Sequence, residues 1–277
     1  MKLKIMGSGG GEGYPALFCE CEHCKAARKA GGKSLRSVSQ VLIDDKLLMD
    51  LPAATHAHCL ANGISLGHVE HLLITHTHTD HYVPAILDTR GGDYAHNMAA
   101  KQLHIYGNKE VQRKFEATFE LFPIGKEIRE SIVLHTVHAF EPFTAGEYTV
   151  TPLKACHAFE EDSLNYIIDD GKKVLLYLLD SGYPYDETLR FIADYGKKID
   201  CVVMDATMGN GYYKGHMNFA ENKKLKAYLT SEGMCDANTE FIVTHITHNH
   251  AGTHEEIEKI FAGSGIDVSF DGYEKNF

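Results

Sequence analysis

The chain of 277 residues has no uninterrupted apolar run long enough to span a bilayer, which argues against a membrane-spanning helix. Basic residues are not in excess, because 27 Lys and Arg stand against 38 Asp and Glu, a formal net charge of −11. Long nucleic acids require many contacts to phosphates, so this balance argues weakly against them as partners. An export signal is also missing, since Met1 to Gly7 has the pattern of a short strand. Seven cysteines without such a signal predict a cytoplasmic location, where cysteine is a thiol or a metal ligand.

No linker or break in composition divides the chain, so we expect a single domain over residues 1–277. Strand and helix patterns follow one another along both halves, which predicts two sheets packed face to face with helices outside. The chain also contains 18 histidines, many of them clustered, which is typical of a metal protein.

The densest cluster of metal-ligand side chains follows the apolar run Val69 to Ile74, which has the length of a buried strand. Side chains alternate along an extended segment, so His76, His78 and Asp80 point the same way. A bend in the chain would bring His81 to the far side of the same pocket. Imidazole and carboxylate together suit zinc, manganese or iron, and four such groups predict two ions side by side.

The pattern His76-x-His78-x-Asp80-His81 resembles the signature of the metallo-β-lactamase-fold hydrolases. The resemblance covers nearly the whole chain and implies an α/β (α+β) fold, a four-layer αββα sandwich of two mixed β-sheets with helices on the outer faces. It also implies further metal ligands at the ends of later strands. Three residues follow apolar runs in the expected order: His157 after 150–155, Asp180 after 174–179 and His245 after 241–244. His78 stands where oxygen-reducing diiron members carry Glu, which favours hydrolysis.

The resemblance implies a dinuclear centre of zinc, manganese or iron ions. One ion would be held by His76, His78 and His157, and the other by Asp80, His81 and His245. Asp180 would bridge them, because a carboxylate has two oxygens. A hydroxide between the ions would attack the substrate, and we count Asp80 among the catalytic residues as well. Asp50, at the end of a predicted strand, is expected to orient one metal-bound histidine.

A second metal site is predicted from a cysteine cluster that follows the glycine-rich turn 7–13. Polar residues are interleaved with the cysteines, so packing in a core does not explain them. Tetrahedral zinc takes four ligands, and we expect His248 to be the fourth, with His23 as the alternative. A reactive redox dithiol is the other interpretation. The three predicted cysteine ligands of a structural zinc are Cys19, Cys21 and Cys24.

This cysteine cluster narrows the resemblance to the phosphoribosyl 1,2-cyclic phosphate phosphodiesterases of the carbon–phosphorus lyase pathway. In that family a cysteine trio and the last histidine of a Thr-His-x-x-His motif hold a zinc, and residues 244–248 have that form. We therefore predict a phosphoric diester hydrolase that acts on a small, cyclic phosphodiester. We expect a small-molecule partner and no membrane or nucleic acid, and a homodimer stays open. Other hydrolases of this fold, namely RNA-processing nucleases, thioesterases and lactonases, stay open too, and a non-catalytic metal-binding protein is the remote alternative.

Two further segments contain histidines outside the predicted metal sets. His216 follows the glycine-containing loop 209–215, is expected to begin a helix, and is predicted to donate a proton to the leaving group. The resemblance supports this role, since the matching segment carries a non-ligand histidine; a helix cap is the alternative. His56 and His58 with Cys59 have no further ligand nearby, so we interpret them as structural. Residues 91–140 match no pattern of the family, and the resemblance implies that they shape the substrate pocket.

Overall fold

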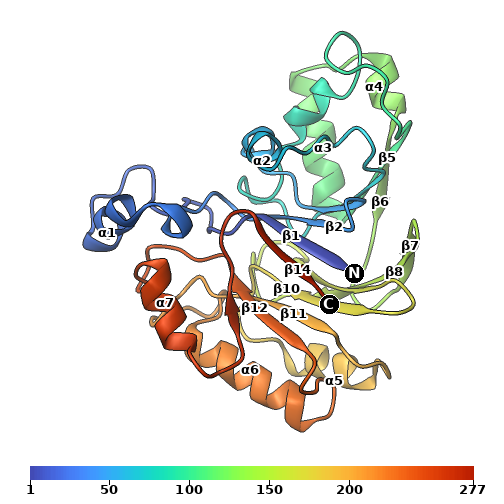
Figure 1. The fold of residues 1–277 in the computed structure, drawn as a ribbon. Coiled ribbons are helices and arrows are strands. Elements are labelled where there is room, and N and C mark those ends of the chain that lie inside the picture. The colour runs from blue at the N-terminus through green and yellow to red at the C-terminus, as the bar shows by residue number, and fades with distance from the viewer.

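The computed structural model describes residues 1–277 as two seven-stranded sheets packed face to face, with helices on both outer faces (Figure 1). This arrangement confirms the predicted αββα sandwich. Both sheets are mixed, since each combines parallel and antiparallel neighbours. The chain builds six strands of one sheet before it builds the other, and its last strand then returns to the first sheet.

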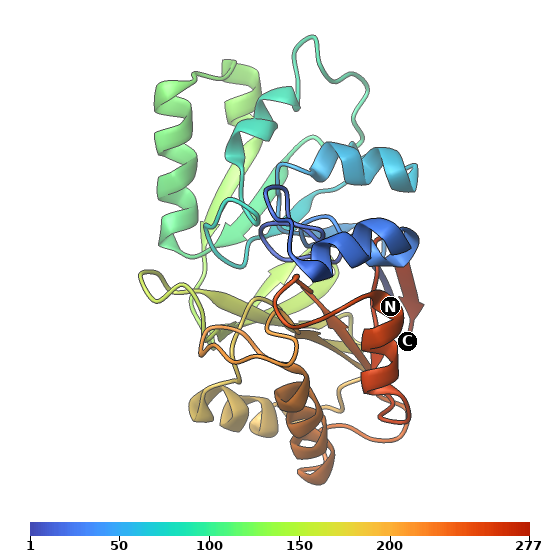
Figure 2. The same cartoon turned by 90° about the vertical axis from the view of Figure 1, so that its left-hand side faces the viewer.

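The first sheet is formed by the first half of the chain and by one strand from its end. Its strands, in spatial order, are β14 (Tyr273–Asn276), β1 (Lys2–Gly7), β2 (Gln40–Ile43), β3 (Leu47–Met49), β4 (His71–Leu73), β5 (Leu103–Gly107) and β6 (Ile132–Thr136). Strand β14 pairs antiparallel with β1, which brings the two ends of the chain together (Figures 1 and 2). The sequence did not predict β14, because it alternates no apolar residues; the more apolar segment 266–270 contains the short β13 of the other sheet.

The second sheet is formed by the second half of the chain. Its strands, in spatial order, are β13 (Asp267–Val268), β12 (Glu240–Thr244), β11 (Cys201–Asp205), β10 (Val174–Leu178), β9 (Leu164–Asp169), β8 (Tyr148–Lys154) and β7 (Phe143–Ala145). Strands β10 to β13 are parallel, and β9 is antiparallel to both of its neighbours. The carboxyl ends of β8, β10, β11 and β12 therefore meet at one edge of this sheet.

The helices lie outside the sheets, except for α1, which projects beside them (Figures 1 and 2). The helices are α1 (Glu22–Ala30), α2 (Thr55–Asn62), α3 (Lys109–Leu121), α4 (Lys126–Glu130), α5 (Asp186–Asp194), α6 (Phe219–Ser231) and α7 (His254–Phe261), with 3₁₀ turns η1 (Gly32–Ser34) and η2 (Pro84–Thr89). Helices α2 to α4 cover the first sheet and α5 to α7 the second. No helix is both long enough and apolar enough to cross a bilayer.

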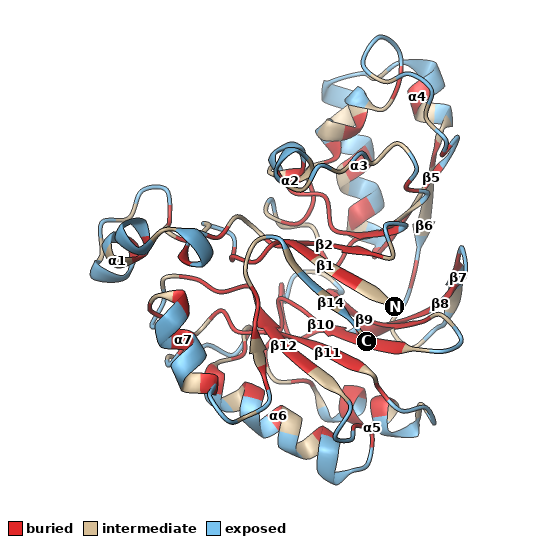
Figure 3. Cartoon of the chain, in the orientation of Figure 1, coloured by how far each residue is buried: buried red, intermediate tan, exposed pale blue.

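Three apolar clusters correspond to the three interfaces between these layers. The middle cluster joins residues such as Ile5 and Val41 of the first sheet to Tyr166 and Val203 of the second. A cluster of 29 buried residues lies between the second sheet and its helices, and a smaller one of 15 lies under the helices of the first sheet. Buried residues accordingly run along both sheets and the inward faces of the helices (Figure 3). Burial of this apolar surface holds the sandwich together.

Helix starts follow their capping residues. Asn108 caps α3, since its side chain accepts hydrogen bonds from the backbone N–H groups of Glu110 and Val111. The predicted helix start at His216 is wrong. Helix α6 begins at Phe219, because Asn218 and Glu221 form a capping box there. His216 instead lies before the helix, in an antiparallel bridge with Tyr213.

Candidate active site

The candidate ligands of the dinuclear centre come from loops that follow four strands, β4, β8, β10 and β12. The structure brings all seven together in two sets of four ligand atoms that share Asp180, and within each set the atoms lie within 4.8 Å of one another. The two sets are His76, His78, His157 and Asp180, and Asp80, His81, Asp180 and His245. These are the sets that the sequence paired.

Asp180 is at the centre of this arrangement. Its Oδ2 atom lies 3.3 Å from His76 Nε2, 2.9 Å from His81 Nε2, 3.4 Å from His157 Nε2 and 3.8 Å from His245 Nε2. Four imidazoles from both sheets thus turn a ring nitrogen toward one carboxylate oxygen. A cation on either side of Asp180 suits this convergence, because the ring nitrogens and the carboxylate can all face it.

The buried atoms of the centre test whether a metal fits it. His76 Nε2, His81 Nε2, His245 Nε2 and Asp180 Oδ1 are buried and have no hydrogen-bond partner of proper geometry. A buried polar atom left without a partner costs about 1–3 kcal/mol. Nitrogen and carboxylate oxygen are the donors that zinc, manganese and iron accept, so the residues present fit divalent ions.

The second ring nitrogen of each buried histidine is held by the protein, which aims the first at the centre. His81 Nδ1 lies 2.8 Å from Asp50 Oδ2, as the sequence predicted for that aspartate. His157 Nδ1 lies 3.0 Å from the carbonyl oxygen of Gly215, and His245 Nδ1 lies 2.7 Å from Thr207 Oγ1. Partners of this kind fix the ring orientation and tautomer of metal-binding histidines.

The charges of the centre balance one another. Burial alone would raise the pKa of Asp180, but the neighbouring imidazoles of His245, His216 and His81 hold that pKa well below its usual range. Burial would lower the pKa of His81, but the carboxylates of Asp80 and Asp50 raise it well above its usual value. Asp180 is therefore a carboxylate at neutral pH, and the proton on His81 is what an arriving cation would displace.

The backbone around the centre adopts unusual conformations. Asp180, His245 and Asp50 have φ angles of 47°, 60° and 63°, in the left-handed region that non-glycine residues rarely adopt. Such conformations cluster at functional sites, where the surrounding fold enforces them. The glycine-rich turn packs against the same centre: a Cβ atom at Gly11 would lie 2.9 Å from Asp80 Oδ2. Glycine there lets the backbone approach a candidate ligand.

Asp205 is a site residue that the sequence analysis missed. His216 Nδ1 lies 2.9 Å from Asp180 Oδ1 and 3.2 Å from Asp205 Oδ2. Asp205 also accepts a hydrogen bond from Thr207 Oγ1, which contacts His245. The signal was present, because Asp205 follows an apolar strand just as Asp180 does. Asp180, Asp205, His216 and His245 form a third set able to hold a metal, so His216 borders the dinuclear centre directly.

A second group of residues that the sequence did not reveal holds Thr77, which stands between two candidate ligands. Glu161 Oε1 accepts hydrogen bonds from Thr77 N at 3.0 Å and Thr77 Oγ1 at 2.7 Å. Lys114 Nζ donates to Thr77 O at 2.5 Å, and Asn108 Nδ2 donates to Glu161 Oε2 at 2.7 Å. We call Glu161, Lys114 and Asn108 the Thr77 clamp. Every polar group of Thr77 is thereby fixed.

The cysteine cluster joins the start of the projecting helix α1, in which Cys24 lies, to His248 in the segment after β12. Its four ligand atoms lie within 4.8 Å of one another, with His248 as the histidine, as predicted. His248 Nδ1 lies 3.6 Å from Cys19 Sγ and 3.5 Å from Cys21 Sγ. Burial would raise the pKa of Cys21, but hydrogen bonds from the backbone N–H of Cys24 and from His248 lower it to about 6. A thiolate among converging donors suits a tetrahedral zinc.

The histidines of α2 form no metal site. His58 Nδ1 lies 2.8 Å from Gln40 Oε1 and its Nε2 lies 2.9 Å from Ser37 Oγ, so both ring nitrogens are used within the protein. No set of metal-ligand atoms includes His56, His58 or Cys59. Their structural interpretation from the sequence agrees with these contacts.

Comparison with known proteins identifies the family. The family model of the beta-lactamase superfamily domain matches residues 43–246, more than half of the chain. The chain belongs to this superfamily. Its fold and family make it a metal-dependent hydrolase of the metallo-β-lactamase superfamily, and the fold implies divalent metal ions.

Solved structures share the whole fold at low sequence identity. A structure described as a new diphosphatase from the PhnP family has a TM-score of 0.76 at 20% identity, covering 100% of this chain and 96% of that one. YhfI from Bacillus subtilis has a TM-score of 0.70 at 21% identity and covers 99% of this chain and 98% of that one. Zn²⁺-bound PqqB from Methylobacterium extorquens has a TM-score of 0.72 at 16% identity, with full coverage of both chains.

Among curated proteins, a ribonuclease Z from Staphylococcus epidermidis is 32% identical over 97 residues. This match covers 32% of the present chain and 31% of the ribonuclease, so it spans less than a third of that relative's length.

Proposed function

We propose that the chain is a dinuclear-metal-dependent phosphodiesterase that acts on a small, cyclic phosphodiester. The observation that carries the proposal is the pair of ligand sets joined by Asp180, beside which His216 and Asp205 stand. A pair of cations suits an ester of phosphate, whose oxygens carry negative charge on both sides of the reacting atom. The likeness to a diphosphatase of the PhnP family supports chemistry at phosphorus.

In this proposal each ligand set holds one ion. His76, His78 and His157 would hold the first, Asp80, His81 and His245 the second, and Asp180 both. Bound ions of this kind lower the pKa of water toward about 7 and polarise phosphoryl oxygens. Asp50, Thr207 and the Gly215 carbonyl oxygen keep the imidazoles turned toward the centre.

Substrate would approach from the side on which the centre is open. The side chain of His78 is 41% exposed, and those of Asp80 and His216 are each 16% exposed, whereas the remaining ligands are buried. A cavity of about 380 Å³ beside His157 is lined by Lys109 and Lys154 and also by the carboxylates of Glu161 and Asp162. Lys154 pairs with Glu187, so Lys109 is the lysine of this lining left to meet an anionic part of a small substrate.

His216 would donate the proton that the leaving alkoxide needs. Its Nδ1 faces the carboxylates of Asp180 and Asp205, which orients the ring and leaves Nε2 for the substrate. Every other histidine of the centre belongs to one of the paired ligand sets. Positioned acids of this kind contribute about 10²–10⁴-fold in rate.

A ribonuclease Z-like nuclease is the second candidate function. The 97-residue match to ribonuclease Z favours this candidate. A ribonuclease, like the proposed enzyme, cleaves a phosphodiester. The formal net charge of −11 favours the small substrate, since a long RNA needs many basic contacts.

The test compares substrates and one variant. The metal-replete protein should cleave a cyclic phosphodiester with a higher kcat/KM than a precursor tRNA, a thioester or a lactone; a preference for one of these others would overturn the proposal. His216→Ala should keep its metals and lose far more rate on a diester with an alkyl alkoxide leaving group than on one with nitrophenolate. Equal losses on both substrates would show that His216 positions substrate, and loss of metal would make it a ligand.

A further inference from the structure

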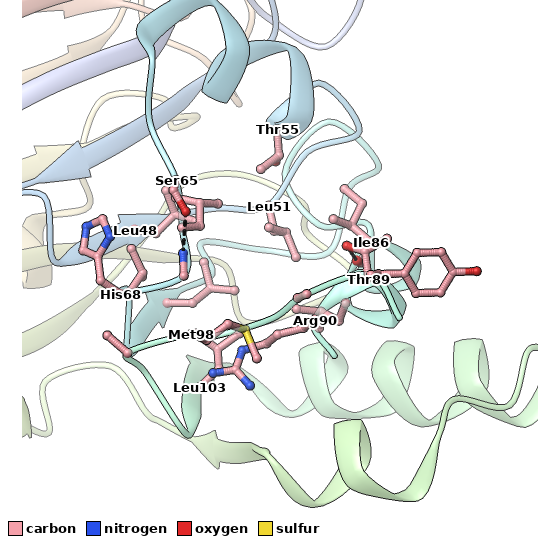
Figure 4. A pocket seen from close by; sticks show the side chains of 18 of the residues that line it. Leu48, Leu51, Thr55, Ser65, His68, Ile86, Thr89, Arg90, Met98 and Leu103 are labelled. Carbon is pink, nitrogen blue, oxygen red and sulfur yellow. Dashed lines mark hydrogen bonds between the residues drawn. The ribbon is translucent and has the colours of Figure 1, made fainter. Parts of the chain in front are cut away.

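A large apolar cavity lies under the helices of the first sheet, away from the candidate ligands (Figure 4). Its volume is about 590 Å³, and none of its lining residues belongs to a candidate metal set. Leu48, Leu51 and Leu72 form its floor on the sheet, and Ile86 and Leu87 of η2 form one wall. Residues 94–99 form the other wall, so this part of the stretch 91–140 lines a cavity other than the one beside His157.

This cavity opens to solvent, since lining residues such as Tyr94 are exposed, so a ligand can enter it without any part of the fold unpacking. Its volume lies within the range of about 300–1,000 Å³ found for small-molecule sites. The wall 94–99 has no helix or strand and is tied to its neighbours at few points, one being the hydrogen bond from Ala100 N to Gly67 O at 3.0 Å. It can therefore adjust to an occupant.

The cavity has one cationic group that no acidic side chain neutralises. Arg90 lines it, and its guanidinium donates to Ser131 Oγ at 2.7 Å and to Ala100 O at 2.9 Å. No carboxylate lies within ion-pair distance of Arg90, whereas Arg113 and Arg129 each pair with a glutamate. Burial lowers the pKa of Arg90, and no acidic neighbour counteracts this. Of the five N–H donors of a guanidinium, those that Arg90 does not use are free for an anion.

We infer that this cavity binds an amphiphile with one apolar chain and one anionic head group, and a medium-chain carboxylate is the chemical class that fits. The leucine floor and the η2 wall would take the chain, and Arg90 would take the carboxylate. Thr89 and Asn97 add a hydroxyl and an amide group to the lining. This site is separate from the proposed dinuclear centre, and its test does not depend on turnover.

The experiment measures binding of decanoate and of decan-1-ol to the full-length, metal-replete protein, below the concentrations at which either aggregates. Isothermal titration calorimetry should give saturable binding of decanoate at about one per chain, and weaker binding of the alcohol. The ε-methyl NMR signal of Met98, assigned with Met98→Leu, should shift on addition of decanoate because Met98 lines the cavity. Absence of saturable binding, or equal affinity for acid and alcohol, would overturn the inference.

Three variants localise the site. Arg90→Gln should weaken decanoate about 10- to 100-fold while leaving the alcohol unchanged, because it removes charge-assisted hydrogen bonds. Arg90→Lys keeps the charge and should bind decanoate more tightly than Arg90→Gln. This comparison distinguishes the effect of the lost charge from the effect of a loosened cavity wall. Ala95→Phe places a ring in the cavity and should weaken both ligands. Decanoate binding that survives Ala95→Phe undiminished would place the ligand elsewhere and refute the site.

Discussion

The Thr77 clamp leads to a prediction about one half of the dinuclear centre. Thr77 separates His76 from His78, so its backbone position sets the spacing of two candidate ligands of the same ion. Glu161→Ala removes the acceptor of two hydrogen bonds from Thr77 and one from Asn108. We expect the first ion, at His76, His78 and His157, to bind more weakly in this variant.

The magnitude follows from the bonds that are lost. Hydrogen bonds to a charged group are worth about 1.5–3 kcal/mol each, and Glu161 is only partly buried, so its two bonds to Thr77 contribute about 2–3 kcal/mol together. The backbone of Thr77 stays partly fixed in the variant, because Lys114 still donates a hydrogen bond to its carbonyl oxygen. Removing a group that orients a metal ligand typically lowers metal affinity about 10- to 100-fold. We expect a loss of this size for the first ion. The second ion should change by less than about threefold.

The assay is a calorimetric titration of metal-free protein with Mn²⁺ or Zn²⁺, in which the two ions bind in separable steps. Asp162→Ala is the matched control, because it removes a neighbouring carboxylate that is exposed and whose side chain makes no hydrogen bond. Glu161→Gln should be intermediate, since its amide oxygen can still accept from Thr77. If Glu161→Ala binds both ions as tightly as the control does, the clamp does not position the ligands.

Three further predictions concern other groups. Asp180→Ala should weaken both ions and abolish turnover, whereas His157→Ala should weaken mainly one; full metal content and rate in Asp180→Ala would show that the ligand assignment is wrong. Cys21→Ser should lose one chelator-resistant zinc per chain by elemental analysis and about 3 kcal/mol of unfolding free energy, and native thiols that all alkylate freely would contradict this site. Burial lowers the pKa of His58 to about 4, so the unfolded chain takes up a proton first as pH falls from about 6.5. The free energy of unfolding should then drop by up to about 3 kcal/mol between pH 6.5 and 4, and His58→Gln should lose this part of the slope in urea titrations; an unchanged slope would refute it.

Local patterns in the sequence predicted most of the metal ligands. His76, His78, Asp80 and His81 follow one apolar run so closely that a single segment presents all four side chains. A buried strand followed by an acidic or imidazole side chain can also be recognised in a single sequence. Asp180 and His245 have this pattern, but it was the resemblance to the metallo-β-lactamase-fold hydrolases that implied ligands at these strand ends. Asp205 satisfies the same pattern and was missed, because nothing local distinguishes an aspartate that faces His216 from one that ends a strand.

The remaining differences arise from contacts between distant segments. Glu161 and Lys114 look like ordinary charged residues in the sequence. Only the fold brings the loop between β8 and β9, which carries Glu161, and helix α3, which carries Lys114, to Thr77. Strand β14 carries Tyr, Glu, Lys and Asn, a pattern with no apolar alternation, and it exists because β1 offers it an edge. His216 was predicted at a helix start, but the capping box at Asn218 begins the helix later.

The distance along the chain between the halves of the cysteine cluster has a consequence for synthesis. Cys19 Sγ and His248 Nδ1 lie 3.6 Å apart although 229 positions separate them, and His245 joins the dinuclear centre from the same short segment. A ribosome releases the three cysteines long before that segment, so a nascent chain carries exposed thiols that lack their histidine partner. Neither centre is complete until the segment after β12 is in place, because it carries both His245 and His248. Until then the growing chain can lose its cysteines to oxidation or to an unsuitable metal, and a chain truncated before residue 245 can complete neither centre.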